Sequence, residues 1–250
     1  MNHSQCSWPS LLPRALPWFA MVALSSILHW ADIARGDELS NNPTLNQYIL
    51  QRLGEFEQIP DQRQLALQQL AQYVEQQLAA GRTAQLTFIC THNSRRSHLA
   101  QIWGAVAAEY YGIDAMATYS GGTQSTAFNP RAVAALQRVG FQIQATGAKL
   151  NPHYEVTSDP KKSPQVCFSK VHSAEPNPHN NFCAVMTCSD ADANCPVVQG
   201  AELRIAIPYD DPKAADGTPA ESATYDERCA QIAREMLYVC AQVKTLRTLP

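Results

Sequence analysis

The feature that most constrains the fold is an alternation of short apolar runs with helical patterns. β-Rich apolar runs occur at residues 86–90, 116–119, 182–187 and 203–207, and helical patterns span residues 97–111, 129–140 and 225–243. Strands that alternate with helices are typical of a mainly parallel sheet covered by helices. We therefore expect an α/β domain over residues 84–248.

Two further segments accompany this domain. Residues 154–171 are typical of a β-hairpin, which we expect to be a surface insertion. Residues 40–82 predict a helical extension of two helices, in which Asn42 supplies an N-cap, Pro43 occupies the first turn and Gly81 ends the second helix. We expect this extension to serve packing or partner binding.

Residues 1–36 form a leader. The uncharged apolar run Ala15–Leu28 is shorter than the ~20 residues needed to span a bilayer. A preceding Arg14 and the following Ala34-Arg35-Gly36 fit a signal peptide. A disordered leader upstream of the true start is equally consistent, and an exported enzyme would have to keep its thiols reduced. We expect a cytoplasmic protein without stable membrane insertion, with export after cleavage near Gly36 as the alternative.

Charge and cysteine usage narrow the function. A formal net charge of -3 argues against a nucleic-acid-binding protein, and any anionic substrate must be held by a local positive field. A chain of 250 residues with eight cysteines can build a core without a disulfide framework. Four of the cysteines lie inside strand or helix patterns and are expected to be small buried hydrophobic residues: Cys167, Cys183, Cys229 and Cys240.

The segment Cys90-Thr-His-Asn-Ser-Arg-Arg96-Ser97 lies between a predicted strand and a predicted helix. A loop at such a junction can surround an anion with backbone N–H groups, and the helix N-terminus adds positive charge. At its base Cys90 would be a thiolate nucleophile, Arg96 would clamp two oxygens and Ser97 would donate a hydrogen bond to the sulfur. The oxyanion-binding loop would comprise Thr91, His92, Asn93, Ser94 and Arg95. The alternative is a buried structural cysteine beside two surface arginines.

This Cys-x5-Arg-Ser pattern resembles the low-molecular-weight protein tyrosine phosphatase family, and is more similar still to its thioredoxin-coupled arsenate reductase branch. The similarity continues through Ser120–Thr123 and Asn129–Val133 and covers roughly residues 86–243. It implies a flavodoxin-like, four-stranded parallel sheet with the anion loop at the strand ends. His92 stands where the family usually has glycine, and Arg95 where it often has a second loop cysteine. We therefore expect less backbone freedom at His92 and extra positive charge from Arg95 at the site mouth.

A phosphatase of this family needs an acid that protonates the leaving oxygen. The segment Tyr209-Asp-Asp-Pro212 follows the fourth predicted strand, and its Asp-Pro matches the acid loop of the family. Asp-Pro alone is a common turn, so its position after a strand is the stronger indication. We assign the acid role to Asp211, with Asp210 as the second candidate.

A second cysteine segment, Cys188-Ser-Asp-Ala-Asp-Ala-Asn-Cys195-Pro, follows the third core strand and resembles the cysteine segment of thioredoxin-coupled arsenate reductases. The resemblance implies a relay in which Cys188 attacks the Cys90 sulfur and Cys195 then attacks Cys188. We expect Asp190 and Asp192 to keep this segment solvated and mobile. Two inert loop cysteines are the alternative. No metal site is expected, because two cysteines seven positions apart lack a close ligand pair.

Three functions follow from these motifs. Phosphatase chemistry needs Cys90, Arg96 and Asp211 and gives no reason for residues 188–195. We therefore expect an arsenate reductase with no tightly bound cofactor, whose partners are arsenate and thioredoxin or a similar dithiol protein. The alternative is a phosphatase that hydrolyses phosphomonoesters through a Cys90 phosphocysteine, although no aromatic residue follows Pro212 closely to contact a tyrosyl ring. A non-catalytic anion or redox sensor would turn over neither substrate.

Overall fold

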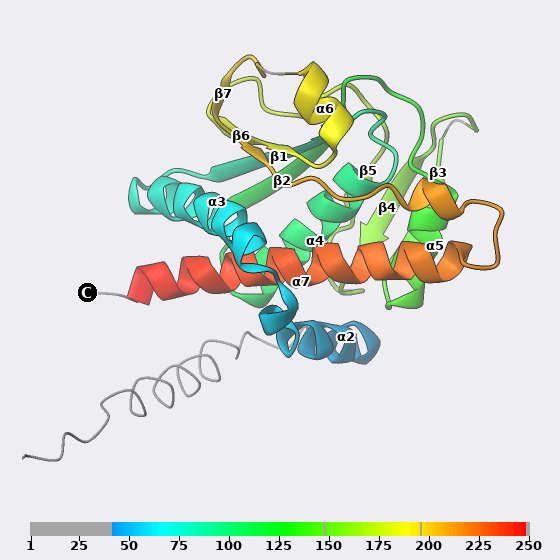
Figure 1. Cartoon of the computed structure of the whole chain (residues 1–250), viewed down its shortest axis with the longest axis horizontal. Coiled ribbons are helices and arrows are strands. Elements are labelled where there is room, and N and C mark those ends of the chain that lie inside the picture. Colours follow the sequence, from blue (N-terminus) through cyan, green and yellow to red (C-terminus); the bar gives the residue numbers. More distant parts are fainter. Residues whose placement is uncertain (1–41, 148, 196, 249–250) are drawn as a thin grey trace, which may run out of the picture. The chain divides into compact units, whose positions relative to one another are not determined.

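The computed structural model describes residues 42–147, 149–195 and 197–248 (Figure 1). The expected leader, its possible signal peptide and the start of the helical extension lie outside the described residues. No helix within the described ranges is long and apolar enough to cross a membrane.

The central sheet consists of β1 (Ala84–Cys90), β2 (Met116–Gly122), β6 (Phe182–Met186) and β7 (Ala201–Ala206). Its strand order is β2-β1-β6-β7, and all neighbouring strands are parallel. This confirms the α/β class and the four-stranded parallel sheet. Strand β6 is buried throughout and β1 at every residue except Gln85, as expected for central strands. The carboxyl ends of β1 and β6 therefore meet at one edge, where Cys90 and Thr187 emerge.

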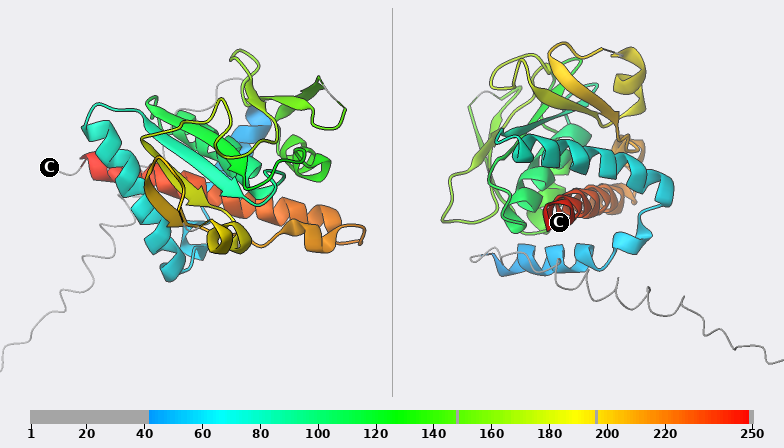
Figure 2. Two further views of the ribbon diagram at one scale, coloured as in Figure 1. Left: turned by 90° about the horizontal axis from the view of Figure 1, so that it is seen from above. Right: turned by 90° about the vertical axis from the view of Figure 1, so that its left-hand side faces the viewer.

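Helices α3 (Asp61–Ala79), α4 (Arg96–Tyr110) and α7 (Glu221–Thr248) pack with this sheet. Helix α4 contacts β1 and β2, whereas α3 contacts β1 and β7. The long helix α7 runs beside α3 and α4 and also contacts α2 (Pro43–Leu53) and α5 (Pro130–Arg138), as Figure 2 shows. The helices of the N-terminal extension are thus joined to the last helix of the chain.

The start and stop signals of the extension act as predicted. Asn42 caps α2, because its side-chain oxygen accepts a hydrogen bond from Leu45 N at 3.1 Å, and Pro43 occupies the first turn. A 3-10 turn (η1, Phe56–Gln58) leads to α3, and Gly81 follows α3 with a positive φ of 69° that favours glycine. The cap at the start of α2 and the glycine after α3 thus lie where short local patterns of the sequence predicted them.

A second, three-stranded antiparallel sheet contains β3 (Gln142–Thr146), β4 (His153–Thr157) and β5 (Gln165–Cys167). The pairing of β4 with β5 confirms the predicted hairpin. The sequence pattern did not predict β3. Its residues Gln-Ile-Gln-Ala-Thr are mostly exposed, so they carry little of the hydrophobic alternation by which a strand is recognised.

The cysteine predictions can be compared directly with the fold. Cys167, Cys183, Cys229 and Cys240 are fully buried, as predicted. After Cys188, where a solvated and mobile segment was expected, residues Ser189–Asn194 form a short helix, α6. Arg204 on β7 holds this helix by donating to the backbone carbonyl of Asp192 at 2.7 Å and to its carboxylate at 2.6 Å. The carboxylate of Asp192 is thus paired, whereas Asp190 is exposed to solvent as expected.

Candidate active site

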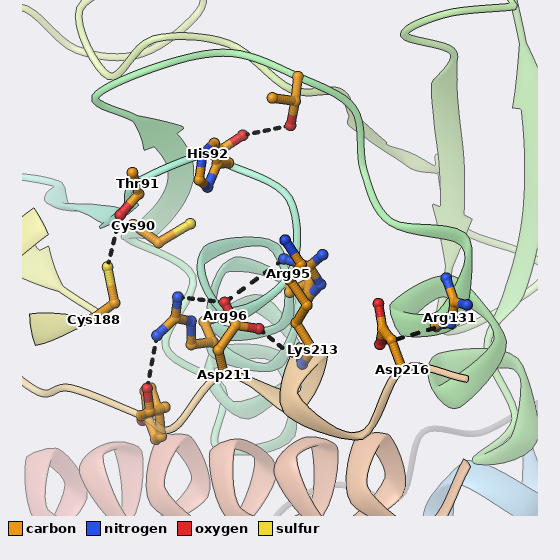
Figure 3. A network of polar contacts seen from close by, with 12 residues as sticks. Cys90, Thr91, His92, Arg95, Arg96, Arg131, Cys188, Asp211, Lys213 and Asp216 are labelled. Atoms are coloured by element: carbon orange, nitrogen blue, oxygen red, sulfur yellow. Dashed lines mark hydrogen bonds and ion pairs between the residues drawn. The ribbon is translucent and has the colours of Figure 1, made fainter. Parts of the chain in front are cut away.

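The loop between β1 and α4 begins with Cys90, which is 3 % exposed (Figure 3). Its positive φ falls at Asn93 (42°) and not at His92, where less backbone freedom was expected. Asparagine enters this left-handed region more readily than most residues, so the loop needs no glycine at His92. The His92 carbonyl instead accepts hydrogen bonds from Thr126 Oγ1 at 3.1 Å and Ser169 Oγ at 3.0 Å.

A chain of hydrogen bonds directs a proton toward the Cys90 sulfur. The Lys170 backbone N–H donates to Asn93 Oδ1 at 2.9 Å, which sets the orientation of the Asn93 amide. Asn93 Nδ2 therefore donates to Ser97 Oγ at 2.9 Å. Because the Ser97 oxygen accepts this bond, its hydroxyl hydrogen is free for Cys90 Sγ, 3.1 Å away. The contact predicted between Ser97 and the sulfur is thus present, with a defined direction.

Gly122 permits the close packing of the loop on β2. A Cβ atom there would lie 2.7 Å from Asn93 N and 2.8 Å from Thr91 O, distances that real side chains do not show. Gly121 is similarly tight, because its Cβ would lie 2.3 Å from His172 Cα. The Ser-Gly-Gly-Thr segment at residues 120–123 therefore supports the loop through close backbone approach.

Arg96 starts α4 and turns back toward the segment after β7. Its Nη1 donates to the Tyr209 carbonyl at 2.9 Å, and its Nη2 donates to Asp211 Oδ2 at 2.7 Å (Figure 3). Its Nε is buried and has no partner among the described residues. A guanidinium fixed along one edge, with a buried donor left over, fits the binding of a tetrahedral oxyanion.

The two candidate acids differ in position. Asp211 caps the 3-10 turn η2 (Pro212–Ala215) by accepting from Lys213 N at 3.1 Å, and it pairs with Arg96. The Asp210 side chain is 97 % exposed and lies 3.6 Å from Arg228. The arrangement therefore favours Asp211 as the acid.

Arg95 contributes less free charge at the mouth than expected. Its Nε donates to the Tyr225 hydroxyl at 3.1 Å, and its Nη1 lies 3.6 Å from Asp211 Oδ2. The Tyr225 hydroxyl in turn donates to Asp216 Oδ1 at 2.9 Å. Asp211 thus faces two guanidinium groups and offsets part of their charge.

The two other cysteines of interest lie next to this loop. Cys188 Sγ is 3.5 Å from Thr91 Oγ1 and accepts from Ala191 N at 3.4 Å (Figure 3). Cys90 and Cys188 belong to one cluster of buried residues, and half-buried Cys195 packs against it. The cluster consists of Ile89, Cys90, Phe182, Ala184, Met186, Cys188, Ala191 and Val198. The fold therefore brings Cys90 next to a pair of cysteines that lies about a hundred positions further along the chain.

Burial lowers the pKa of two ionisable groups under the loop, His98 and Lys170. Burial, and after it the charge of Lys170, lowers the pKa of His98 to about 3. The neutral His98 ring stacks on Phe128 at 4.1 Å and contacts Ser120 Oγ through Nδ1 at 3.1 Å. Burial also lowers the pKa of Lys170, whereas Cys167 raises it. Both residues support the loop from the core. Among the described residues, no group of three His, Cys, Asp or Glu could hold a metal ion.

Comparison with known proteins decides the family. Residues 85–158 match the sequence model for low molecular weight phosphotyrosine protein phosphatase. Arsenate reductase 2 of Staphylococcus epidermidis is 30% identical over 125 residues, which are 50% of this chain and 76% of that protein. Arsenate reductase of Bacillus subtilis is 32% identical over 142 residues, 56% of this chain and 83% of that protein. The chain belongs to the low molecular weight phosphotyrosine protein phosphatase family.

Solved structures show a weaker likeness to this chain than the relatives found by sequence. The phosphatase from Vibrio cholerae O395 is 15% identical with a TM-score of 0.42, over 66% of this chain and 97% of that one. The thioredoxin-dependent arsenate reductase of Corynebacterium glutamicum is 18% identical with a TM-score of 0.36, over 80% and 86% of the two chains.

Sequence reasoning missed several contacts that support the loop and the segments around it. At the end of the hairpin, Ser169 donates to the His92 carbonyl and the Lys170 backbone N–H donates to the Asn93 side chain. Arg204 donates to the carbonyl of Cys195 at 3.1 Å. Arg63 of the N-terminal extension contacts the segment that carries Asp211. No local pattern marks these residues, because each acts across a long stretch of chain.

Proposed function

We propose that this protein is an arsenate reductase in which Cys90 is the nucleophile and Cys188 and Cys195 form a thiol relay. The observation that carries the proposal is the shared buried cluster of Cys90 and Cys188, against which Cys195 packs. A phosphatase would need no second thiol beside its nucleophile. The names of the curated relatives, arsenate reductases at 30% and 32% identity, support the same function.

In the first step, the Cys90 thiolate attacks the arsenic of arsenate. The loop amides of residues 91–95 and the Arg96 guanidinium hold the anion, and Ser97 supports the sulfur. One arsenic–oxygen bond breaks, and Asp211 donates a proton so that the oxygen leaves as water. The product is a Cys90–arsenic(V) adduct, in which no electron has yet been transferred.

The second step transfers the electrons. The Cys188 thiolate attacks Cys90 Sγ, the sulfur–arsenic bond breaks, and its electron pair stays on arsenic, which leaves as arsenite. Two thiols have been oxidised to a Cys90–Cys188 disulfide, and arsenic has gained two electrons. The Cys195 thiolate then attacks Cys188 Sγ and releases Cys90, so that the disulfide moves to Cys188–Cys195.

The last disulfide needs an external reductant. Cys195 is half-buried whereas Cys188 is fully buried, so the relay moves the oxidised pair toward solvent. A dithiol protein such as thioredoxin can then attack it and restore both thiols by exchange. This requires no bound cofactor.

Helix α6 must unwind during the relay. Cys188 and Cys195 stand at its two ends, and seven residues at helical rise place their Cα atoms about 10 Å apart. A disulfide requires Cα atoms within about 7 Å. We therefore expect oxidation to Cys188–Cys195 to break the hydrogen bonds from Asp192 N to Cys188 O and from Cys195 N to Ala191 O. Hydrogen exchange at these amides should rise by about two orders of magnitude or more, as in local unfolding. Unchanged protection in the oxidised protein would contradict the second exchange step.

The direct test is turnover by the purified protein. With a thioredoxin reducing system, arsenite should form from arsenate, and phosphate should compete because it fits the same loop. Hydrolysis of p-nitrophenyl phosphate, measured in parallel, reports the phosphatase alternative. Arsenite formation at the rate of the reductant alone, together with efficient ester hydrolysis, would reject the reductase function.

One structural observation also supports the phosphatase alternative. Cys90, Arg96 and Asp211 are arranged as ester hydrolysis needs, with the acid 2.7 Å from the guanidinium. Weak phosphomonoester hydrolysis is therefore expected beside arsenate reduction. It would proceed through a Cys90 phosphocysteine and would not involve Cys188 or Cys195.

A further inference from the structure

Arg63 lies on α3, in the helical extension, and reaches across to the segment after β7. Its Nη1 donates to the Pro208 carbonyl at 2.9 Å, and its guanidinium stacks over the Tyr209 ring at 4.6 Å. Glu235 on α7 fixes the same guanidinium, accepting from Nε at 3.1 Å and from Nη2 at 2.8 Å. All three nitrogens of the Arg63 guanidinium therefore donate hydrogen bonds, and one of its faces covers the Tyr209 ring.

The bonds made by Arg63 complete the support of this segment. The N–H groups of Ile207 and Tyr209 bind the Met186 and Thr187 carbonyls at 2.9 and 3.1 Å, which ties one side of the segment to β6. Pro208 has no N–H group to donate, and Arg63 binds its carbonyl, which is the other side of the peptide that donates through Tyr209 N.

The contacts continue directly to the active site. The Tyr209 carbonyl, one residue beyond Pro208, accepts from Arg96 Nη1, and Asp211 accepts from Arg96 Nη2. Movement of this segment would therefore displace both the acid and the partner that orients the anion-binding arginine.

We propose that Arg63 is a positioning residue that couples the N-terminal helical extension to the active site by holding residues 208–211. The inference rests on the proposed function, because it assigns Asp211 and Arg96 their parts in the reaction. It gives the extension a role in catalysis in addition to packing. Glu235, whose side chain is 2 % exposed, anchors Arg63 and would be left as a buried unpaired charge without it.

A matched control is available in the same part of the fold. Arg234 also joins α7 to the extension, through Glu55 at 3.2 Å and Gln58 at 3.1 Å. Its side chain is 17% exposed, against 16% for Arg63. Within the described part of the chain, Arg234 makes no hydrogen bond or ion pair with residues 208–211, so Arg234→Met removes a similar cross-link without touching the acid segment.

The experiment compares Arg63→Met with Arg234→Met in the full chain. We expect Arg63→Met to lower kcat/KM for arsenate reduction by about tenfold to a hundredfold, as displacement of catalytic groups by about 1 Å does. Phosphate should also protect Cys90 less well against iodoacetamide. Arg234→Met should retain near wild-type kinetics. Thermal unfolding of both variants shows whether their losses of stability are comparable.

A double-mutant cycle separates positioning from general destabilisation. If Arg63 acts through the segment that carries Asp211, Arg63→Met should cost less activity in an Asp211→Asn background than in the wild type. Should Arg63→Met fail to fold, Arg63→Lys, which keeps the charge but reaches fewer partners, replaces it in the cycle.

The outcomes are distinct for the two proposals. A wild-type protein that neither reduces arsenate nor shows phosphate protection of Cys90 would overturn the proposed function itself. An active wild type in which Arg63→Met behaves like Arg234→Met, or in which the losses from Arg63→Met and Asp211→Asn simply add, would overturn the role of Arg63 alone.

Discussion

In a Cys188→Ser variant, arsenate reduction should fall to the uncatalysed background while hydrolysis of p-nitrophenyl phosphate continues at close to the wild-type rate. A serine hydroxyl cannot attack the Cys90 sulfur and form a disulfide, so the arsenic(V) adduct has no route to arsenite. The ester reaction uses Cys90, Arg96 and Asp211, which the substitution leaves in place. Arsenite release and p-nitrophenol release, assayed on the same preparation, give the two rates.

Cys195→Ser provides the sharpest comparison. Without external thiols, this variant should still release one arsenite per protein, because Cys188 can complete the first disulfide. It should then stop as a Cys90–Cys188 disulfide, which mass spectrometry of the digested protein identifies. Cys183→Ser serves as the control for loss of a thiol, since Cys183 is buried in β6 outside the cluster of Cys90 and Cys188. Arsenate reduction that persists in Cys188→Ser would exclude the relay.

Arg96→Lys should lower kcat/KM for arsenate by about a hundredfold to a thousandfold, the range found when a fixed oxyanion donor is removed. Arg96 binds the Tyr209 carbonyl and Asp211 through one edge and retains a buried Nε for the anion. A lysine ammonium is a single centre and cannot hold both partners and two anion oxygens in one plane. The inhibition constant for phosphate should rise in parallel.

Arg95→Lys is the matched control for this substitution. It makes the same change of side chain one residue away. Arg95, however, donates its hydrogen bond to Tyr225, and its distance of 3.6 Å from Asp211 is too long for a hydrogen bond. We expect a much smaller loss of activity in this variant. Near-normal kinetics in Arg96→Lys, or equal losses in both variants, would contradict the assignment of Arg96 as the anion clamp.

The eight residues from Cys90 to Ser97 show how far local sequence reaches. Strand, turn and helix are encoded within one continuous segment, so nucleophile, loop and arginine could be recognised without knowledge of packing. The caps of α2 and the four strands of the main sheet follow equally from short patterns, since each depends on neighbours only a few positions away.

Other parts could not be deduced in this way. Strand β3 lies on a small sheet with mostly exposed residues, and its pairing with β4 makes it a strand where its own pattern is weak. The acidic segment of α6 suggested solvation, but Arg204 pairs with Asp192 and stabilises a helix there. In both cases a partner outside the segment overrides local preference.

The sequence by itself determined the α/β class, the family and the chemistry expected at Cys90, because these depend on residue types at short spacings. Only the tertiary structure decided that Lys170 orients Asn93 toward Ser97 and that Arg63 and Glu235 support the acid segment. Such hydrogen bonds join residues far apart in the chain. They depend on how helices and sheets pack in three dimensions, and no local pattern of residues shows which side chains this packing brings together.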